Sequence, residues 1–349
     1  MVREGRRGTG WRLVIYGLIV IAAVSLSGGA NARAANTTQP ADSSKGTAGK
    51  TGPATQQQRP EDLRAATSPT AVTAGCRRAL PQGLQAGTTA VRTISSGGMS
   101  RQYRLHLPPG STNATGLAVV LNFHGRYGTA QDQESYSGLL PISDREHFLL
   151  VSPDGTGDPR GWSAGATPPN GVDDVRFVSD LLDTLSQELC IDPGRVYATG
   201  FSNGAFMASR LGCEMSDRVA AIAPVGGVDY PASACGGPMP VLAIHGTADP
   251  VVPLPGGLVR RWMYPGARAA MAGWAAQNRC APAFQSTAIS RAMRWDDYRA
   301  CGAETAMIVV EGGGHTWPGA PDAAKPAASS DDISAAEMIW AFFSSKTRA

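Results

Sequence analysis

Six short, mainly apolar runs recur along the chain and restrict its fold more than any other feature. They cover residues 117–123, 148–152, 196–201, 219–225, 241–244 and 306–310. Runs of this kind are typical of strands that helices bury on both faces of a parallel sheet. Helical patterns lie between them, the clearest over residues 175–189 and the last over residues 333–343. This alternation predicts an α/β fold with a doubly wound, mostly parallel sheet.

A hairpin is predicted before the first of these runs. Apolar and polar residues alternate over residues 91–96 and again over residues 101–107, and Gly97-Gly98 separates the two segments. Alternation on both sides of a glycine turn is typical of an antiparallel strand pair. We therefore expect an antiparallel N-terminal edge hairpin on the sheet, within one domain at residues 76–349.

The N-terminal segment has the order of a secretory signal peptide. Four arginines, at positions 3, 6, 7 and 12, precede an apolar run at residues 13–26, and small residues follow at 30–34. This order predicts a signal peptide at residues 1–34. A membrane anchor is the alternative, but a span needs about 20 apolar residues and this run is shorter. The adjacent arginines leave twin-arginine export open. Either route predicts a secreted or periplasmic protein, with no stable membrane insertion after cleavage.

Residues 35–75 are predicted to form a disordered linker. They are dominated by Ala, Thr, Gln, Pro, Ser and Gly, and they bury too little apolar surface to offset the entropy of ordering. The segment ends before Cys76 in a sequence that resembles a lipoprotein acylation site, but no apolar run stands directly before it.

The formal charge of +3 is concentrated in the signal segment. Charge therefore gives no reason to predict a nucleic-acid or anionic-membrane partner.

All six cysteines lie beyond the predicted linker. An even count in an oxidising compartment indicates disulfides rather than metal ligands, and no CxxC pair favours zinc. Spacing favours Cys280 with Cys301 and Cys213 with Cys235. Cys76 with Cys190 then follows by subtraction, although the spacing leaves other pairings open. We predict no metal site.

The pattern Gly-x-Ser-x-Gly occurs twice, around Ser163 and around Ser202. Ser163 precedes Pro168-Pro169, which forbid a helix on its C-terminal side, so we interpret it as an accidental match. Ser202 follows a strand pattern at residues 195–199 and precedes a helical pattern at residues 205–211. A strand, a sharp turn and a helix are typical of a serine nucleophile. The helix N-terminus also directs N–H groups at any oxyanion formed there.

A serine nucleophile needs a histidine base that a carboxylate orients. In this type of fold the chain order is Ser, acid, His, which leaves His245 and His315 as candidates. His245 would have to use Asp229, whereas His315 can use Asp249. We favour Asp249 and His315, because each follows a predicted strand at the edge of the sheet where open α/β sheets bind ligands.

An oxyanion hole requires two N–H donors. One comes from the residue after the nucleophile, here Asn203, and the other from a loop after an earlier strand. The run at residues 117–123 ends in His124-Gly125-Arg126, so the N–H of Gly125 or Arg126 is the expected second donor. His124 itself is expected to be structural.

Together these motifs resemble the secreted esterase family that contains poly(3-hydroxybutyrate) depolymerases and feruloyl or acetylxylan esterases, carbohydrate esterase family one of the α/β-hydrolase superfamily. The matching stretches are residues 75–76, 101–105, 122–125, 172–177, 195–204, 245–253 and 312–319. The resemblance implies an α/β-hydrolase fold, with Ser202 as nucleophile, Asp249 as acid and His315 as base. It implies no metal or organic cofactor.

The expected substrate pocket departs from this family in one loop. Arg126 and Tyr127 stand where we expect smaller residues, and they would narrow the acyl pocket or add a cation beside it. Trp162 and Trp317 are the best candidates to line an acyl or aromatic pocket together with Tyr127. Packing in the core or at the rim is the alternative for both tryptophans.

The predicted function is hydrolysis of carboxylic esters by a secreted serine esterase, through an acyl-enzyme. Its substrates would be feruloyl or acetyl esters of plant polysaccharide, or hydroxyalkanoate oligomers. The same residues would also serve a peptidase or an acyltransferase. A catalytically silent hydrolase fold used as an exported binding protein is a further alternative. It is disfavoured because the serine, acid, histidine and both oxyanion elements are all present.

Overall fold

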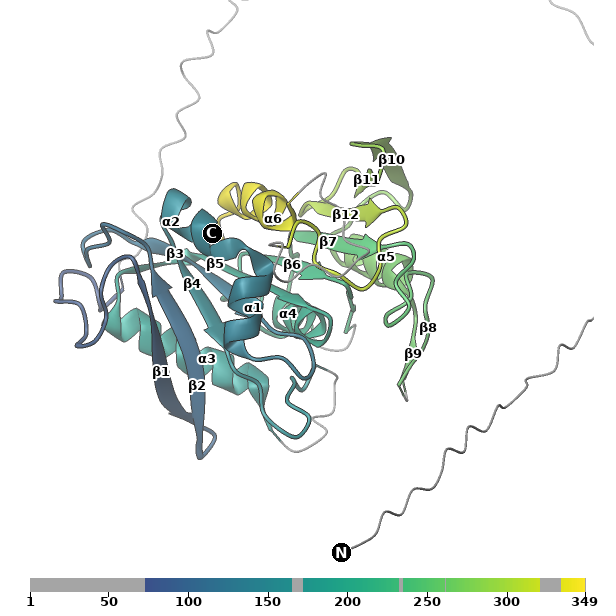
Figure 1. Cartoon of the computed structure of the whole chain (residues 1–349). Coiled ribbons are helices and arrows are strands. Elements are labelled where there is room, and N and C mark those ends of the chain that lie inside the picture. The colour runs from purple at the N-terminus through teal and green to yellow at the C-terminus, as the bar shows by residue number, and fades with distance from the viewer. Residues whose placement is uncertain (1–72, 165–171, 232–234, 261, 321–333, 349) are drawn as a thin grey trace, which may run out of the picture. The chain divides into compact units, whose positions relative to one another are not determined.

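The structure is a computed structural model that describes residues 73–164, 172–231, 235–260, 262–320 and 334–348 (Figure 1). The predicted signal peptide, most of the predicted linker, Pro168-Pro169 and residue 333 lie outside these ranges. Residues 73–75, expected in the linker, belong to the fold. Thr73 Oγ1 donates to the Leu189 carbonyl at 2.8 Å, and the Gly75 N–H donates to that of Ser186 at 3.0 Å. Hydrogen bonds rather than apolar side chains hold this segment, so its composition did not indicate order.

Ten strands form one sheet, and the predicted fold class is confirmed. They are β1 (Thr88–Ser96), β2 (Met99–Leu107), β3 (Leu117–Phe123), β4 (Phe148–Pro153), β5 (Ile191–Phe201), β6 (Ala221–Val225), β7 (Val241–Gly246), β10 (Phe284–Ala288), β11 (Met293–Tyr298) and β12 (Thr305–Val310). Their order is β1-β2-β4-β3-β5-β6-β7-β12-β11-β10. All neighbours from β4 to β12 pair in parallel, and β1 and β2 form the predicted antiparallel edge.

Helices cover both faces of the sheet (Figure 1). They are α1 (Ala130–Ser137), α2 (Leu139–Glu146), α3 (Asp174–Glu188), α4 (Asn203–Glu214), α5 (Ala267–Gln277) and α6 (Ala335–Ser344). In β3, Val119 and Leu121 pack into the core that α3, α4 and α5 share, whereas Ala118 and Val120 pack into the core beneath α2 and α6. Both faces of the strand are buried, which explains its continuous apolar sequence.

The sheet has a second antiparallel edge that we did not predict. β11 pairs antiparallel with β12 and with β10, and all five residues of β10 are exposed. A strand without a buried face lacks the apolar alternation that marks strands in a sequence. A small separate hairpin, β8 (Gly257–Val259) with β9 (Trp262–Tyr264), was also missed, because three-residue strands are too short for a pattern.

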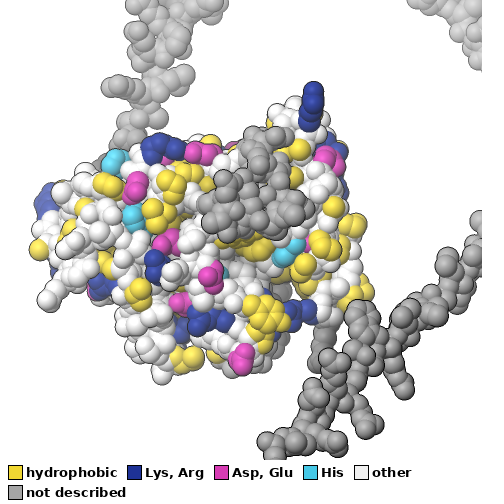
Figure 2. Space-filling model, in the orientation of Figure 1, with side chains coloured by type: hydrophobic (Ala, Val, Ile, Leu, Met, Phe, Trp, Pro, Cys, Tyr) yellow, Lys and Arg dark blue, Asp and Glu magenta, His cyan; other side chains and the backbone are white. Residues whose placement is uncertain are grey.

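Three disulfides join Cys76 to Cys190, Cys213 to Cys235 and Cys280 to Cys301. These are the pairs that spacing and subtraction indicated. Within the described ranges, no helix is both long enough and apolar enough to cross a membrane. Acidic and basic side chains are interspersed on the face shown in Figure 2, in keeping with the small net charge of the folded part.

Candidate active site

Ser202 stands in a sharp turn between β5 and α4. Its backbone has φ 55° and ψ −113°, a conformation that residues other than glycine rarely adopt. Glycines on both sides let the strand and the helix approach closely. A Cβ on Gly200 would lie 2.6 Å from the Gly204 carbonyl oxygen, and a Cβ on Gly204 would lie 2.2 Å from that of Phe123. The spacing Gly-x-Ser-x-Gly is therefore a packing requirement of this turn.

We expect Gly204→Ala to reduce the free energy of unfolding by about 3 kcal/mol or more, since backbone atoms surround the site and cannot move aside as a side chain would. Thermal and urea unfolding measure this loss. Gly237→Ala is the matched control, because the nearest atom to a Cβ there is the Ser216 hydroxyl at 3.9 Å. Equal stability of the two variants would contradict this account of the turn.

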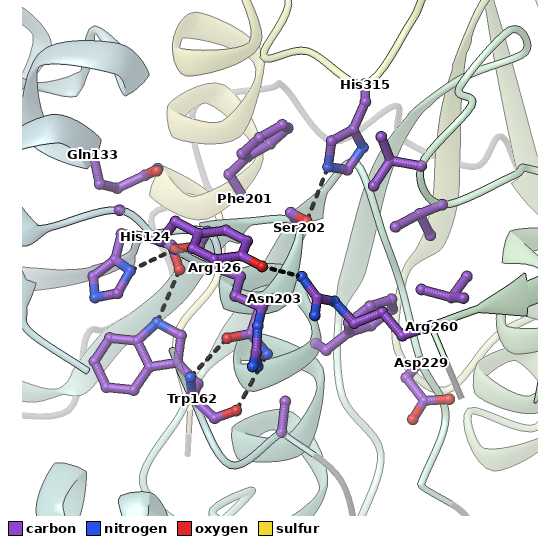
Figure 3. A pocket seen from close by; sticks show the side chains of 18 of the residues that line it. His124, Arg126, Gln133, Trp162, Phe201, Ser202, Asn203, Asp229, Arg260 and His315 are labelled. Atoms are coloured by element: carbon purple, nitrogen blue, oxygen red, sulfur yellow. Dashed lines mark hydrogen bonds between the residues drawn. The ribbon is translucent and has the colours of Figure 1, made fainter. Parts of the chain in front are cut away.

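Ser202, His315 and Asp249 form one hydrogen-bonded chain, and Figure 3 shows its Ser202–His315 part. Ser202 Oγ lies 2.9 Å from His315 Nε2, and His315 Nδ1 lies 2.7 Å from Asp249 Oδ2. A carboxylate can only accept, so Nδ1 carries the proton and Nε2 is left to accept the serine proton. Asp249 follows β7 and His315 follows β12, so both reach the carboxyl end of the sheet beside Ser202. The structure thus brings together the three residues that chain order favoured.

The surroundings of Asp249 keep its carboxylate charged. Burial alone would raise the pKa of this group. The hydrogen bond and the charge interaction with His315, together with the N–H groups of Val251 and Val252 at 2.8 Å from Oδ1, hold the pKa below its ordinary value. The carboxylate can therefore orient the His315 ring and stabilise its protonated form.

The alternative pair, His245 and Asp229, does not form. His245 is buried and donates from Nε2 to the Val252 carbonyl at 2.8 Å, and burial lowers its pKa. Asp229 Oδ1 accepts the Tyr230 N–H at 2.8 Å. No hydrogen bond or ion pair among the described residues joins Asp229 to a histidine.

Ser163 occupies a buried loop position. Its N–H donates to Asp174 Oδ2 at 2.8 Å, and its carbonyl accepts from Arg210 Nη1 at 2.6 Å. Within the described part of the chain its hydroxyl has no hydrogen-bond partner, histidine included. The contacts of Ser163 hold the loop to α3 and α4.

The expected oxyanion donors lie beside Ser202. Asn203 is the first residue of α4. Its N–H therefore has no carbonyl of a preceding helical turn to accept it. Among the described residues, the N–H groups of Gly125 and Arg126 also have no acceptor. Three N–H groups are thus available near the nucleophile, and Asn203 with either of the other two would satisfy the two-donor requirement.

Side chains around these donors fix the loop after β3. His124 donates from Nδ1 to the Gly125 carbonyl at 2.7 Å and accepts the Gly155 N–H on Nε2 at 2.9 Å. Burial lowers the pKa of His124, so the ring is neutral and both nitrogens are used.

The Asn203 side chain accepts the Trp162 N–H at 2.6 Å and donates to the Trp162 carbonyl at 3.2 Å. The sequence did not indicate this second contribution of Asn203, since its partner lies in a distant loop.

A pocket of about 1520 Å³ opens over Ser202. Trp162 and Tyr127 line it, as do Arg126 and Phe206. The prediction for Trp317 is wrong: its side chain is 0% exposed and packs in the core beneath α6. The chain turns inward directly after His315, so a position two residues from the histidine points into the core rather than the pocket.

Known proteins resemble this chain over most of its length, although no known family model matches it. NocK of Nocardia uniformis subsp. tsuyamanensis, whose name describes it as an esterase, is 34% identical over 271 residues, which are 69% of this chain and 77% of NocK. Feruloyl esterase D of Neurospora crassa is 29% identical, covering 75% of this chain and 87% of the relative. This chain belongs to their esterase family. The expected family is confirmed, and the chain is a carboxylic ester hydrolase.

Solved structures place this esterase in the α/β-hydrolase fold. The acetyl xylan esterase from Aspergillus awamori superposes with a TM-score of 0.53 at 15% identity, covering 74% of this chain and 99% of that one. A thermostable esterase superposes with a TM-score of 0.52 at 16% identity, covering 74% of this chain and 63% of that one. At these identities the likeness shows the fold alone.

The hairpin β8–β9 forms one wall of this esterase's pocket. Val259, Arg260 and Trp262 line the pocket from the hairpin. Leu258 and Met263 are each 68% exposed, and hydrophobic side chains gather over the hairpin in Figure 2. Arg260 Nη2 donates to the Tyr127 hydroxyl at 3.0 Å across the opening (Figure 3). The hairpin thus joins the loop after β3 at the rim.

Proposed function

We propose that this esterase cleaves its substrates through an acyl-enzyme, with Ser202 as nucleophile, His315 as base and Asp249 as the orienting acid. Asn203 and either Gly125 or Arg126 supply the oxyanion hole. The observation that carries the proposal is the unbroken hydrogen-bonded chain from Ser202 Oγ to Asp249 Oδ2. A structural turn alone would not require a base and a buried carboxylate in this arrangement.

The reaction proceeds in two halves. His315 Nε2 takes the Ser202 proton as Oγ bonds to the ester carbonyl carbon, and the carbonyl oxygen takes the negative charge against the backbone N–H donors. The tetrahedral intermediate collapses, and His315 returns the proton to the departing alcohol. A water molecule then attacks the acyl-enzyme by the same steps, which releases the carboxylic acid and restores Ser202.

The proposed substrates are feruloyl or acetyl esters of plant polysaccharide. Relatives named feruloyl esterase and a structural neighbour named acetyl xylan esterase support this class. The pocket supports the larger acyl group, because its volume far exceeds the need of an acetyl group and aromatic side chains line it. Hydroxyalkanoate oligomers are the second candidate.

We further propose that the protein acts outside the cytoplasm, after export by its signal peptide. The three disulfides support this location, because such bridges persist in oxidising compartments. The signal peptide at residues 1–34 and the linker after it remain part of this proposal.

A panel of esters tests the proposed function. We expect methyl ferulate to have a higher kcat/KM than methyl acetate, acetylated xylan or hydroxybutyrate oligomers, because only its acyl group carries an aromatic ring that the aromatic side chains of the pocket can contact. Ser202→Ala is the control that separates enzymatic from background hydrolysis. Fastest turnover of hydroxybutyrate oligomers, or cleavage of peptides but not esters, would contradict the proposal.

A further inference from the structure

The second Gly-x-Ser-x-Gly pattern, around Ser163, has no part in the proposed mechanism, but its tryptophan contacts the active site. Trp162 lies on the loop after β4 and adjoins the pocket, yet it is only 4% exposed. Its ring packs edge to face against Phe123 and at a tilt against His124, each at 5.0 Å between centroids. So little exposed surface leaves few contacts for a substrate. The role of Trp162 therefore depends on the groups that it holds in place.

Trp162 bonds to both segments that carry the oxyanion donors (Figure 3). Its indole Nε1–H donates to the His124 carbonyl at 2.9 Å, directly before the N–H of Gly125. Its backbone N–H donates to Asn203 Oδ1 at 2.6 Å, and its carbonyl accepts from Asn203 Nδ2 at 3.2 Å. Gly161 makes room for this amide, since a Cβ there would lie 2.8 Å from Oδ1. One residue thus joins the loop after β3 to the start of α4.

The indole bond also determines the direction of a donor. A trans peptide is planar, and its carbonyl and N–H groups point in opposite directions. The bond to the His124 carbonyl therefore fixes the Gly125 N–H. The Gly125 carbonyl accepts from His124 Nδ1, which fixes the Arg126 N–H in the same way. Gly155, on the same loop as Trp162, donates to Nε2 of that histidine. Whichever of the two N–H groups serves, its direction depends on bonds from this loop.

The loop itself is anchored to the rest of the fold. Thr156 and Gly161 exchange two backbone hydrogen bonds, at 3.1 and 3.0 Å, which close it. The Ser163 backbone bonds to Asp174 of α3 and to Arg210 of α4, and both of these side chains are buried. These contacts give the loop a fixed position from which it can hold both donor segments.

Alignment of the donors matters for the reaction. An oxyanion hole stabilises the developing charge only where its donors already point at the oxyanion position. Gly125 adjoins the nucleophile, since a Cβ there would lie 3.5 Å from Ser202 Cβ, and Asn203 directly follows the nucleophile in the chain. The two donors belong to separate segments, so their relative position depends on the contacts between these segments.

We propose that Trp162 is a positioning residue that ties the two donor segments of the oxyanion hole together, and that it acts through these bonds rather than through contact with the substrate. This inference rests on the proposed function, because it assumes that Ser202 is the nucleophile and that these N–H groups stabilise the oxyanion. It goes further in assigning the second pattern, whose serine is not the nucleophile, a role in the reaction.

Two ketones separate positioning from pocket shape. The carbonyl carbon of 2,2,2-trifluoroacetophenone bonds to the Ser202 oxygen while His315 takes the serine proton, so the ketone oxygen becomes an oxyanion. Acetophenone binds with its carbonyl planar. Removal of one oxyanion donor costs about 100- to 1000-fold, and a misaligned donor loses part of that. In Trp162→Phe, which keeps a ring but lacks the indole N–H, Ki for the trifluoro ketone should therefore rise by about 10- to 100-fold.

In the same variant, Ki for acetophenone should change by less than about threefold, because only a tetrahedral oxyanion uses the aligned donors. The value of kcat/KM for p-nitrophenyl acetate should fall by about the factor by which Ki for the trifluoro ketone rises. An equal loss of affinity for both ketones would show that Trp162 shapes the pocket or contacts the ligand, and would overturn the inference. Unchanged affinity for both ketones would overturn it as well.

Trp274→Phe is the matched control. Trp274 is also buried, and its Nε1 donates at 2.8 Å to the carbonyl of Asp229, another residue that lines the pocket. The substitution removes the same kind of bond from a wall without the proposed oxyanion donors. Both Ki values should stay within about threefold of wild type. Unfolding curves of the two tryptophan variants check that each is folded under the assay conditions.

Asn203→Ala tests the other link and leaves the tryptophan in place. It removes both bonds between the Asn203 side chain and Trp162 but keeps the backbone N–H, so Ki for the trifluoro ketone should rise by a similar factor. The two links act in series, because loss of either one separates the donor segments. The double variant with Trp162→Phe should therefore lose about as much as either single variant. A rise in Ki equal to the product of the two single rises would contradict the inference.

Ser202→Ala separates failure of this inference from failure of the proposed function. In that variant the trifluoro ketone should bind no more tightly than acetophenone. If its advantage over acetophenone is lost in Ser202→Ala but unchanged in Trp162→Phe, only the role of Trp162 is rejected. An advantage that survives Ser202→Ala rejects the proposed nucleophile, on which the inference depends.

Discussion

Ser202→Ala and His315→Ala should each lower kcat for p-nitrophenyl acetate by roughly six orders of magnitude. The serine supplies the atom that bonds to the acyl carbon, and without a base its hydroxyl is a poor nucleophile. The double variant should lose no more than either single variant, because the two groups act as one unit. Steady-state kinetics on the purified variants, with their unfolding curves as a check of folding, measure these losses.

Ser163→Ala is the matched control for this prediction, since it removes the hydroxyl of the other Gly-x-Ser-x-Gly pattern. The Ser163 contacts with Asp174 and Arg210 use only its backbone, so this variant should retain a substantial fraction of activity. If the fold-loss of kcat in the Ser202 and His315 double variant equals the product of the two single-variant losses, the two residues act separately. That result would contradict the proposed mechanism.

Asp249→Asn should lower kcat by up to about four orders of magnitude with little change in KM. An amide can donate to Nδ1, which would favour the tautomer with its proton on Nε2. That ring could no longer accept the Ser202 proton. The same variant also removes the negative charge that stabilises the His315 imidazolium. Kinetics with saturating and limiting p-nitrophenyl acetate separate the effects on kcat and KM.

Asp229→Asn should lower kcat for the same acetyl ester far less, because no hydrogen bond or ion pair in the described part of the chain joins Asp229 to His245 or His315. Near-wild-type turnover by Asp249→Asn would contradict the assignment of the acid. So would a larger loss in His245→Ala than in His315→Ala. Either result would leave the esterase family intact and require a different set of catalytic residues.

The central sheet and the nucleophile turn could be predicted because local sequence carries their physical requirements. Burial of β3 on both faces requires a continuous apolar run, and the predicted bounds match the observed strand. The turn at Ser202 requires Gly200 and Gly204, since a Cβ at either would collide with backbone. Chain order then restricted the acid and base to a few candidates.

Features that depend on distant partners could not be predicted in this way. β10 is fully exposed, and β11 carries the charged sequence around Asp296, whose carboxylate is buried against Arg268 of α5 at 2.9 Å. Neither strand has an apolar pattern. The direction of Trp317 and the place of Asp229 in the pocket depend likewise on how loops from separate strands pack together.

The most direct test of the central claim, that Ser202 is the nucleophile, is labelling with a fluorophosphonate followed by peptide mass mapping. Trypsin cleaves after Arg195 and Arg210, which puts Ser202 and Ser209 on one peptide, and cleaves after Arg160 and Arg176 around Ser163. Fragmentation of the labelled peptide distinguishes Ser202 from Ser209. We predict one label per chain, on Ser202, and none in His315→Ala over the same time. Label on Ser163, or no label on active protein, would contradict the account.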